Sequence, residues 1–74
     1  MAETQTLALR GDFIPLDALL KATAIAPSGG AAKLMIAEGQ VWVDGVVERR
    51  KTCKLRAGQV VEAAGQRVQV APAA

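Results

Sequence analysis

The sequence predicts an α+β fold in which two short helices pack on a small, mostly antiparallel sheet. Three observations lead to this prediction. An apolar stripe at helical spacing covers residues 16–24, a capped helical pattern lies between Ser28 and Gly39, and residues 41–70 alternate in the manner of strands joined by tight turns. A repeat near 3.6 residues is typical of helices, and a repeat of two is typical of strands.

The N-terminal part holds one weak strand pattern and the first helix. Residues 5–9 alternate weakly and could add an N-terminal edge strand. The first helix is predicted over 16–24, with Pro15 in its first turn. Ala26-Pro27 should end it, because the residue before a proline avoids the helical region. The apolar stripe that we expect to be buried consists of Leu16, Leu19, Leu20 and Ala24.

The second helix is predicted over residues 29–38. Ser28 is a good N-cap, and Gly39 is placed to end the helix in a left-handed conformation. Gly29 and Gly30 in the first turn cost roughly 1 kcal/mol each relative to alanine. They are easier to understand if a ligand approaches the backbone there as in an anion nest, or if another helix packs closely. The sequence leaves both explanations open.

Short strands and turns follow the second helix. Val41 and Val43 alternate with Trp42, as in a half-buried strand, and Asp44-Gly45 is a strong turn signal. The chain returns through residues 46–47. Cys53 and Leu55 alternate with basic residues. Further turns are expected at Ala57-Gly58 and Gly65-Gln66, and further strands at Val60-Val61 and around Val68 and Val70.

Length and composition indicate one globular domain. We expect residues 1–74 to form a single domain, with a core at about 5–70 and frayed termini. The aromatic residues are Phe13 and Trp42 alone, so leucine, valine, isoleucine and alanine must build the core. A single cysteine and the absence of histidine argue against a disulfide, a metal site or a cofactor, and favour the reducing cytoplasm. Neither a signal peptide nor a membrane-spanning stretch is predicted.

Positive charge is concentrated in residues 49–56, here called the basic segment. It holds five of the nine basic residues and no acid, so the remainder of the chain carries 4 − 7 = −3. Concentrated positive charge suggests an anionic polymer as partner, because each neutralised phosphate releases condensed counterions. The alternative is a solvated strand that protects a sheet edge. The five cations are Arg49, Arg50, Lys51, Lys54 and Arg56.

The spacing from Ser28 onward resembles the S4-like RNA-binding domain family, named after ribosomal protein S-four and also called the alpha-L motif. The matching residues are Ser28, Ala32, Met35-Ile36, Gly39, Val41-Trp42-Val43, Asp44-Gly45 and Gly58-Gln59, without gaps. The similarity extends over about residues 15–70. The small stand-alone bacterial members, the YbcJ-like proteins, are most similar because they share Ser-Gly-Gly followed by Ala-Lys and Glu-Arg-Arg-Lys-x-Cys-Lys.

This resemblance implies two helices on a curved sheet and binding of structured RNA, such as rRNA or tRNA. In the wider family, basic residues in the first turn of the second helix touch phosphates. This chain has Gly29 and Gly30 there and retains Lys33. The helix N-terminus with Ser28 can still offer backbone N–H groups to a phosphate. We therefore expect a phosphate clamp between that N-terminus with Lys33 and the basic segment.

Three further residues have competing interpretations. Asp44 suits the turn, although the turn could also place a backbone amide near RNA. Trp42 is interpreted as packing on the sheet rather than as a platform for stacked bases, since a lone aromatic makes a poor platform. Cys53 is expected to point into the core and not to be a reactive thiol.

Enzymatic activity is not expected, because the chain has no histidine or tyrosine and no pairing of a nucleophile with a base. The sequence therefore favours a non-enzymatic, monomeric RNA-binding protein that is cytoplasmic and ribosome-associated, without a small-molecule substrate. Shape and phosphate contacts should outweigh the recognition of bases. The alternative is a protein-interaction adaptor that docks through its sheet or basic face.

Overall fold

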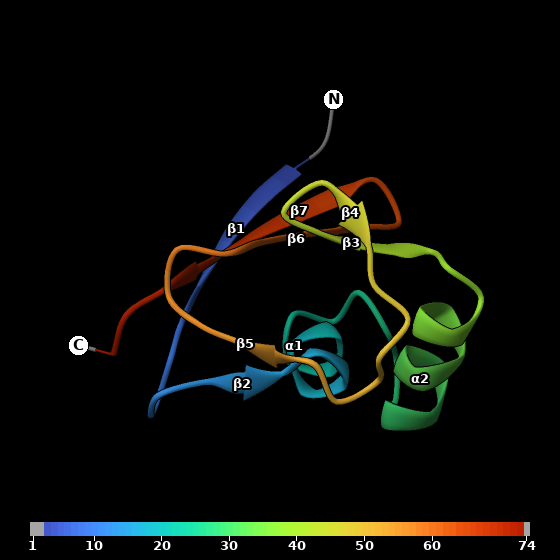
Figure 1. Ribbon diagram of the computed structural model, residues 1–74, viewed down its shortest axis with the longest axis horizontal. Helices are drawn as coiled ribbons and strands as arrows, with labels where there is room; N and C mark the ends of the chain where they lie inside the picture. Colours follow the sequence, from blue (N-terminus) through green and yellow to red (C-terminus); the bar gives the residue numbers. More distant parts are fainter. Residues whose placement is uncertain (1–2, 74) are drawn as a thin grey trace.

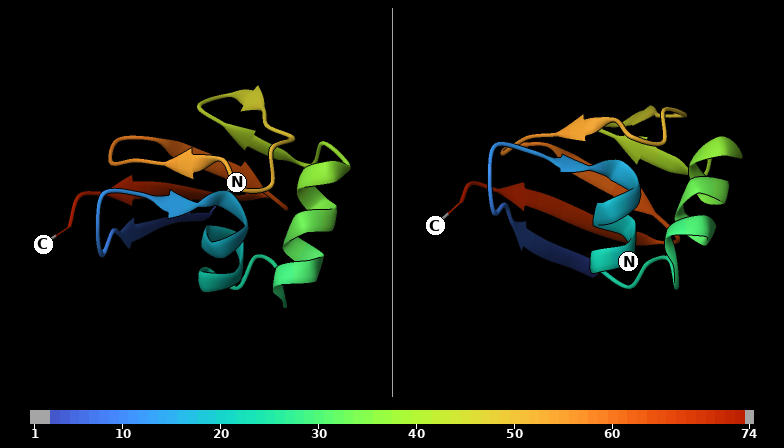
Figure 2. Two further views of the ribbon diagram at one scale, coloured as in Figure 1. Left: turned by 60° about the horizontal axis from the view of Figure 1, so that its bottom comes forward. Right: turned by 90° about the horizontal axis from the view of Figure 1, so that it is seen from below.

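A computed structural model describes residues 3–73 and has the predicted α+β arrangement (Figure 1). Two helices, α1 (Leu16–Ala22) and α2 (Gly29–Ala37), pack against each other and lie on one side of the sheet, as further views confirm (Figure 2). Within the described residues the strands are β1 (Glu3–Ala8), β2 (Ile14–Pro15), β3 (Val41–Val43), β4 (Val46–Val47), β5 (Lys54–Leu55), β6 (Val60–Ala63) and β7 (Gln66–Ala71).

The main sheet has the strand order β1-β7-β6-β3-β4. Its neighbours are antiparallel except for β1 and β7, which pair in parallel from Glu3 opposite Gln66 to Ala8 opposite Ala71. The predicted N-terminal edge strand is therefore confirmed, although it begins two residues earlier than expected and ends at Ala8. The expectation of frayed termini falls partly on residues 1, 2 and 74, which lie outside the described residues.

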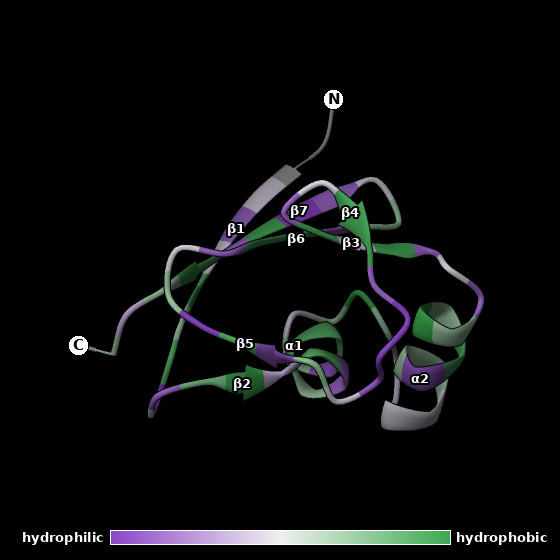
Figure 3. Cartoon of the chain, in the orientation of Figure 1, coloured by the Kyte–Doolittle hydropathy of each residue, from purple (hydrophilic) through white to green (hydrophobic). Residues whose placement is uncertain are grey.

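The core lies between the helices and the inner face of the sheet. Strand residues alternate as predicted, so that the valines of β3 point inward while Trp42 between them points outward. Figure 3 shows apolar residues in α1 and β3 and a hydrophilic stretch of chain between β4 and β5. The buried side chains are Leu9, Leu16, Leu19, Leu20, Ala26, Ala32, Ile36, Val41, Val43, Leu55, Val61, Ala63, Val68 and Val70.

Helix α1 ends at Ala22, two residues before the predicted end. The Thr23 hydroxyl donates a 2.9 Å hydrogen bond to the carbonyl of Leu19, and Ala24 then adopts a left-handed conformation with φ of 61°. Ala24 is exposed, so its place in the predicted apolar stripe was wrong. Ala26 is buried in its place.

Helix α2 matches the prediction to within one residue. The Ser28 hydroxyl accepts a 3.1 Å hydrogen bond from the backbone N–H of Ala31, which confirms the N-cap. Gly39 has φ of +74°, in the left-handed region that favours glycine at a helix end.

A separate two-stranded sheet, which the sequence did not predict, pairs β2 with β5. Pro15 lies in β2 and is the N-cap residue of α1, not a residue of its first turn as predicted. Its ψ of 145° keeps it extended, and its φ of −63° suits a proline. The pairing of Pro15 with Lys54 ties the end of the basic segment to the beginning of α1.

The turn between β3 and β4 uses Asp44 and Gly45, both with positive φ, as a two-residue hairpin turn requires. No helix within residues 3–73 is long and apolar enough to cross a membrane.

Candidate nucleic-acid interface

The basic segment runs from the end of β4 past the C-terminal end of α2 to the beginning of α1, and then enters β5 (Figure 1). Its backbone is held by α1: the N–H of Asp17 donates to the Lys51 carbonyl at 3.2 Å, and the N–H of Leu16 donates to the Cys53 carbonyl at 2.9 Å. Both donors belong to the first turn of a helix, where N–H groups have no partner within the helix. The segment is thus fixed mainly through its backbone.

Arg49 lies over the C-terminal end of α2. Its Nη1 donates a 3.3 Å hydrogen bond to the carbonyl of Ala37, at the end of the helix that carries a partial negative charge. A Cβ atom built on Gly39 would lie 2.9 Å from Nη2 of Arg49. Glycine at position 39 therefore satisfies both the left-handed backbone and the close approach of the guanidinium.

Arg50 is paired with Glu48. Its Nη2 lies 2.9 Å from Oε1 of Glu48, and its Nε and backbone N–H both donate to Oε2 at 3.1 Å. The hydrogen bonds from the Arg50 side chain, followed by that from its backbone N–H, lower the pKa of Glu48 to about 2. Glu48 is therefore ionised at neutral pH and compensates much of the Arg50 charge.

The other cations of the segment are exposed. Lys54 Nζ lies 5.0 Å from the centroid of the Phe13 ring, within the range of a cation–π interaction. Lys51 and Arg56 project from turns, and the N–H of Arg56 donates to Gln59 Oε1 at 2.7 Å. An open depression of about 640 Å³ gathers the side chains of Arg49, Arg50, Lys51, Thr52, Cys53 and Lys54.

The N-terminus of α2 is not part of this depression. Helix α2 has nine residues, so its first residue lies about 12 Å along the axis from the carbonyl that Arg49 contacts. Lys33 is exposed between these two ends. The residues of the expected phosphate clamp therefore form two separate positive regions, one at the N-terminus of α2 with Lys33 and one along the basic segment.

No neighbouring element crowds the two glycines at the beginning of α2, so a ligand can approach them from solvent. Among the described atoms, nothing lies within 4 Å of a Cβ built on Gly29, and a Cβ on Gly30 would meet Ser28 Oγ at 3.9 Å alone. A crowded approach of another helix is thus excluded as the reason for these glycines. An anion approaching the helix N-terminus would meet no steric obstacle there.

Asp44 has a structural role. Its Oδ1 accepts a 2.9 Å hydrogen bond from the Val60 N–H, and its Oδ2 accepts from Gln59 Nε2 at 3.3 Å. These bonds link the β3–β4 turn to the loop before β6, which explains why the chain has Gln after Gly58. A carboxylate would also repel phosphate, so the Asp44 side chain is a poor candidate for contact with RNA.

Cys53 is half-buried and packs against the core, as predicted. Burial raises the pKa of its thiol, and Glu48 raises it further, so the thiol is protonated and weakly nucleophilic at neutral pH.

Two features of this surface were not predicted. The first is Glu48, whose carboxylate pairs with Arg50; its position two residues before Arg50 was the only signal in the sequence. The second is the exposure of Trp42, which is 40% exposed on the outer face of the sheet. Alternation placed its side chain on that face correctly, but could not show whether anything covers it.

Comparisons with known proteins agree with the fold. The family model described as "S4 domain" matches residues 7–71. Over 52 residues the chain is 60% identical to YbcJ of Escherichia coli (strain K12) and to YbcJ of Shigella flexneri, with 70% of this chain and 74% of each relative covered.

The solution structure of YbcJ from E. coli, reported to reveal an alpha-L motif involved in RNA-binding, is similar to this structure with a TM-score of 0.67. The two chains are 48% identical, and the match covers 96% of this chain and 89% of that chain. The predicted resemblance is thereby confirmed, and the chain belongs to the S4 domain family.

Proposed function

We propose that this protein binds structured RNA, without catalysis, through contacts to the phosphate backbone and to the shape of the RNA. The RNA is an rRNA or a tRNA, and the protein acts in the cytoplasm as a monomeric single domain that associates with a ribosomal subunit. Membership of the S4 domain family and the alpha-L motif reported for YbcJ support this proposal.

The observation that carries the proposal is the uncompensated positive charge of the basic segment. Among the ion pairs between described side chains, Arg50 is the one member of the segment that has a carboxylate partner. The other four cations are exposed. A segment with a fixed backbone that presents several uncompensated cations is well suited to an anionic polymer, because little backbone order must be gained on binding.

The mode of binding follows from the two positive regions. The basic segment contacts one stretch of backbone, and the N-terminus of α2 with Lys33 contacts another. The first residue of α2 lies about 12 Å along the helix axis from the carbonyl that Arg49 contacts. Two regions at a fixed separation select RNA whose phosphates are held at that spacing, as in a hairpin or a helix junction. A flexible single strand would have to be ordered first, which costs conformational entropy.

The test compares two double charge reversals that change the net charge equally. Lys51→Glu with Arg56→Glu reverses two cations of the basic segment, and Arg10→Glu with Lys21→Glu reverses two exposed cations elsewhere. Each pair changes the net charge by −4, from +2 to −2. Binding to a labelled RNA hairpin is measured by fluorescence anisotropy, and folding by circular dichroism.

Losing two phosphate contacts at 0.1 M salt should weaken binding by about 60-fold in the first variant. The control should bind within a few-fold of the wild type. Equal affinities of the two folded variants would refute the basic segment as the binding surface. A wild-type protein that binds no RNA and is purified free of nucleic acid would favour the protein-interaction adaptor. Crosslinking in cells, followed by sequencing of the attached RNA, would identify the RNA.

A further inference from the structure

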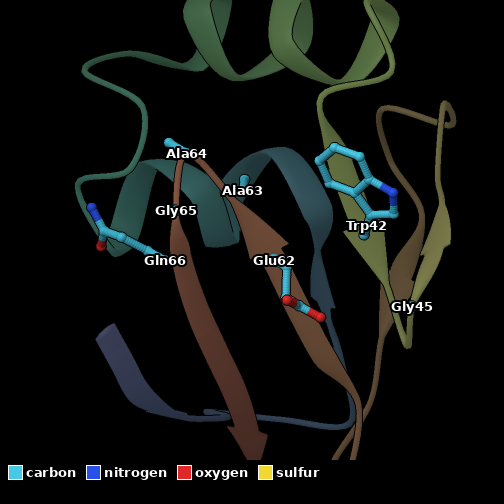
Figure 4. Close-up of a pocket in the computed structure, with 7 residues that line it drawn as sticks. All are labelled: Trp42, Gly45, Glu62, Ala63, Ala64, Gly65 and Gln66. Carbon is cyan, nitrogen blue, oxygen red and sulfur yellow. The ribbon is translucent and has the colours of Figure 1, made fainter. Parts of the chain in front are cut away.

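The outer face of the main sheet has a hollow beside Trp42 (Figure 4). The hollow has a volume of about 360 Å³ and is lined by Trp42, Glu62, Gln66, Gly45 and the Ala64-Gly65 turn. Strand register places Trp42 opposite Glu62, and Glu62 opposite Arg67, so these three side chains share one row on this face. The hollow lies on the face of the sheet that points away from the helices.

Two polar groups of the hollow contact neighbouring side chains. Arg67 Nη2 lies 3.7 Å from Glu62 Oε2, and the two side chains are 50% and 41% exposed. Gln66 accepts a 2.8 Å hydrogen bond from Gln5 of β1. An exposed indole thus lies beside a carboxylate that can accept hydrogen bonds and next to an arginine that can contact a phosphate.

This combination suits a nucleobase better than an apolar side chain of a protein partner. The indole face can stack on a base, and the Glu62 carboxylate can accept a hydrogen bond from an exocyclic amino group at the base edge. An apolar side chain in the same hollow would take the carboxylate out of water without a new hydrogen bond, which is unfavourable.

The hollow is connected to the basic segment by the register of β4. Val47 pairs with Trp42, and the N–H of Glu48 donates to the Val41 carbonyl at 3.0 Å, so Arg49 follows directly. Arg49 is two residues beyond Val47, which corresponds to about 7 Å along an extended chain. A nucleotide with its base beside Trp42 therefore has the Arg67 guanidinium in the same row of side chains, and the basic segment begins a short stretch of chain away.

We propose that the hollow beside Trp42 and Glu62 binds one unpaired nucleobase that carries an exocyclic amino group. This inference rests on the proposed binding of structured RNA and adds a specificity to it. The favoured RNA is then a hairpin with one extruded cytosine, adenine or guanine near the backbone that the basic segment contacts. Uracil is disfavoured, because the one N–H on its edge lies between two carbonyl oxygens that a carboxylate repels.

Trp42 is the single tryptophan and the chain has no tyrosine, so intrinsic fluorescence reports on the hollow directly. The wild type is titrated with a fully paired hairpin and with the same stem carrying one bulged cytosine or uracil. Stacking should make the bulged-cytosine hairpin bind about tenfold more tightly than the paired one. The bulged-cytosine hairpin should quench the fluorescence, and the paired one should not.

Two variants separate stacking from recognition of the base edge. Trp42→Ala should lose the tenfold preference and keep the affinity for the paired hairpin, as measured by the anisotropy of labelled hairpins, since this variant has no tryptophan. Glu62→Gln should keep the quenching and lose most of the preference for cytosine over uracil. Lys51→Glu serves as the control, because it should weaken all the hairpins alike and leave the preference unchanged.

The outcomes distinguish this inference from the proposed function. Equal affinity and equal quenching for paired and bulged hairpins, with RNA binding intact, would overturn the base pocket alone. Failure of the wild type to bind any hairpin would refute the proposed function. In that case a titration with cytidine monophosphate decides the pocket. Quenching that reaches the same amplitude in Glu62→Gln, but only at a higher nucleotide concentration, would support it. The absence of quenching, or a titration that Glu62→Gln leaves unchanged, would overturn it.

Discussion

Replacing Glu48 by glutamine tests how much of the positive charge of the basic segment is available to RNA. Glu48 accepts hydrogen bonds from the Arg50 side chain at 2.9 and 3.1 Å, and it is ionised at neutral pH. If this pair withholds Arg50 from RNA, five cations remain for phosphates: Arg49, Lys51, Lys54, Arg56 and Lys33. Glu48→Gln would make Arg50 the sixth.

The magnitude follows from counterion release. For a duplex-like site, five phosphate contacts give a slope of log K against log salt of about −4.5, and six give about −5.4. The extra contact should strengthen binding by about eightfold at 0.1 M salt, and this gain should vanish near 1 M. Removing a repulsive carboxylate from the path of the RNA acts in the same direction.

The assay is the fluorescence anisotropy of a labelled hairpin, titrated at four or more salt concentrations between 0.05 and 0.5 M as roughly the useful range. Asp12→Asn removes one negative charge from an exposed loop between β1 and β2 and serves as the matched control; its slope should equal that of the wild type. Weaker binding or a shallower slope for Glu48→Gln would refute the reasoning. Glu48 would then orient Arg50 toward a phosphate.

Three further predictions concern stability and the end of α2. Gly39→Ala should lower the free energy of unfolding, measured by urea denaturation, by about 1–2 kcal/mol, because φ is +74° and the new Cβ meets Arg49. Gly11→Ala is the control, because its new Cβ meets no described atom within 4 Å. Gly30→Ala should raise that free energy by up to ~1 kcal/mol, whereas Gly30→Glu should stay folded and bind RNA more weakly; an unfolded Gly30→Glu would contradict the open surface found here. Because the pKa of Glu48 is lowered, its ion pair with Arg50 contributes stability above pH 4.5 that is lost as the pH falls toward 2. Denaturation at several pH values should show this loss in the wild type but not in Glu48→Gln.

Most of the fold could be predicted from the sequence because local signals and burial agree. Ser28 and Gly39 define α2 through the N-cap bond and the left-handed backbone, and Asp44-Gly45 fixes the hairpin register. The end of α1 was missed because Ala24 fits a helical stripe in composition. The side-chain hydrogen bond of Thr23 and the left-handed conformation of Ala24 end the helix, and neither is visible in the hydrophobic pattern.

The arrangement of the predicted site could be predicted only in part. Spacing identified the basic segment, but it could not show that the segment meets the C-terminal end of α2, because this depends on the packing of α1 against α2. The same limit applies to β2 and β5, whose two-residue pairing carries too little pattern to be recognised. The exposure of Trp42 likewise depends on what covers a sheet face, which alternation does not determine.

The parallel pairing of β1 with β7 bears on the order in which the chain folds. Partners in this ladder are 63 residues apart, since Glu3 lies opposite Gln66. At 5–20 residues per second, a ribosome takes about 3–13 s to synthesise the intervening chain. During that time β1 has no partner, while the hairpins from β3 onward can form from neighbouring residues.

An edge strand that is still unpaired would be prone to aggregation if it were apolar. The middle of β1 is Thr4-Gln5-Thr6, which is polar and offers little to another exposed strand. We therefore expect β1 to dock last, onto a sheet that is already formed, and to be the first element to detach. In native-state hydrogen exchange, the amides of β1 should lose protection before those of β6 and β7.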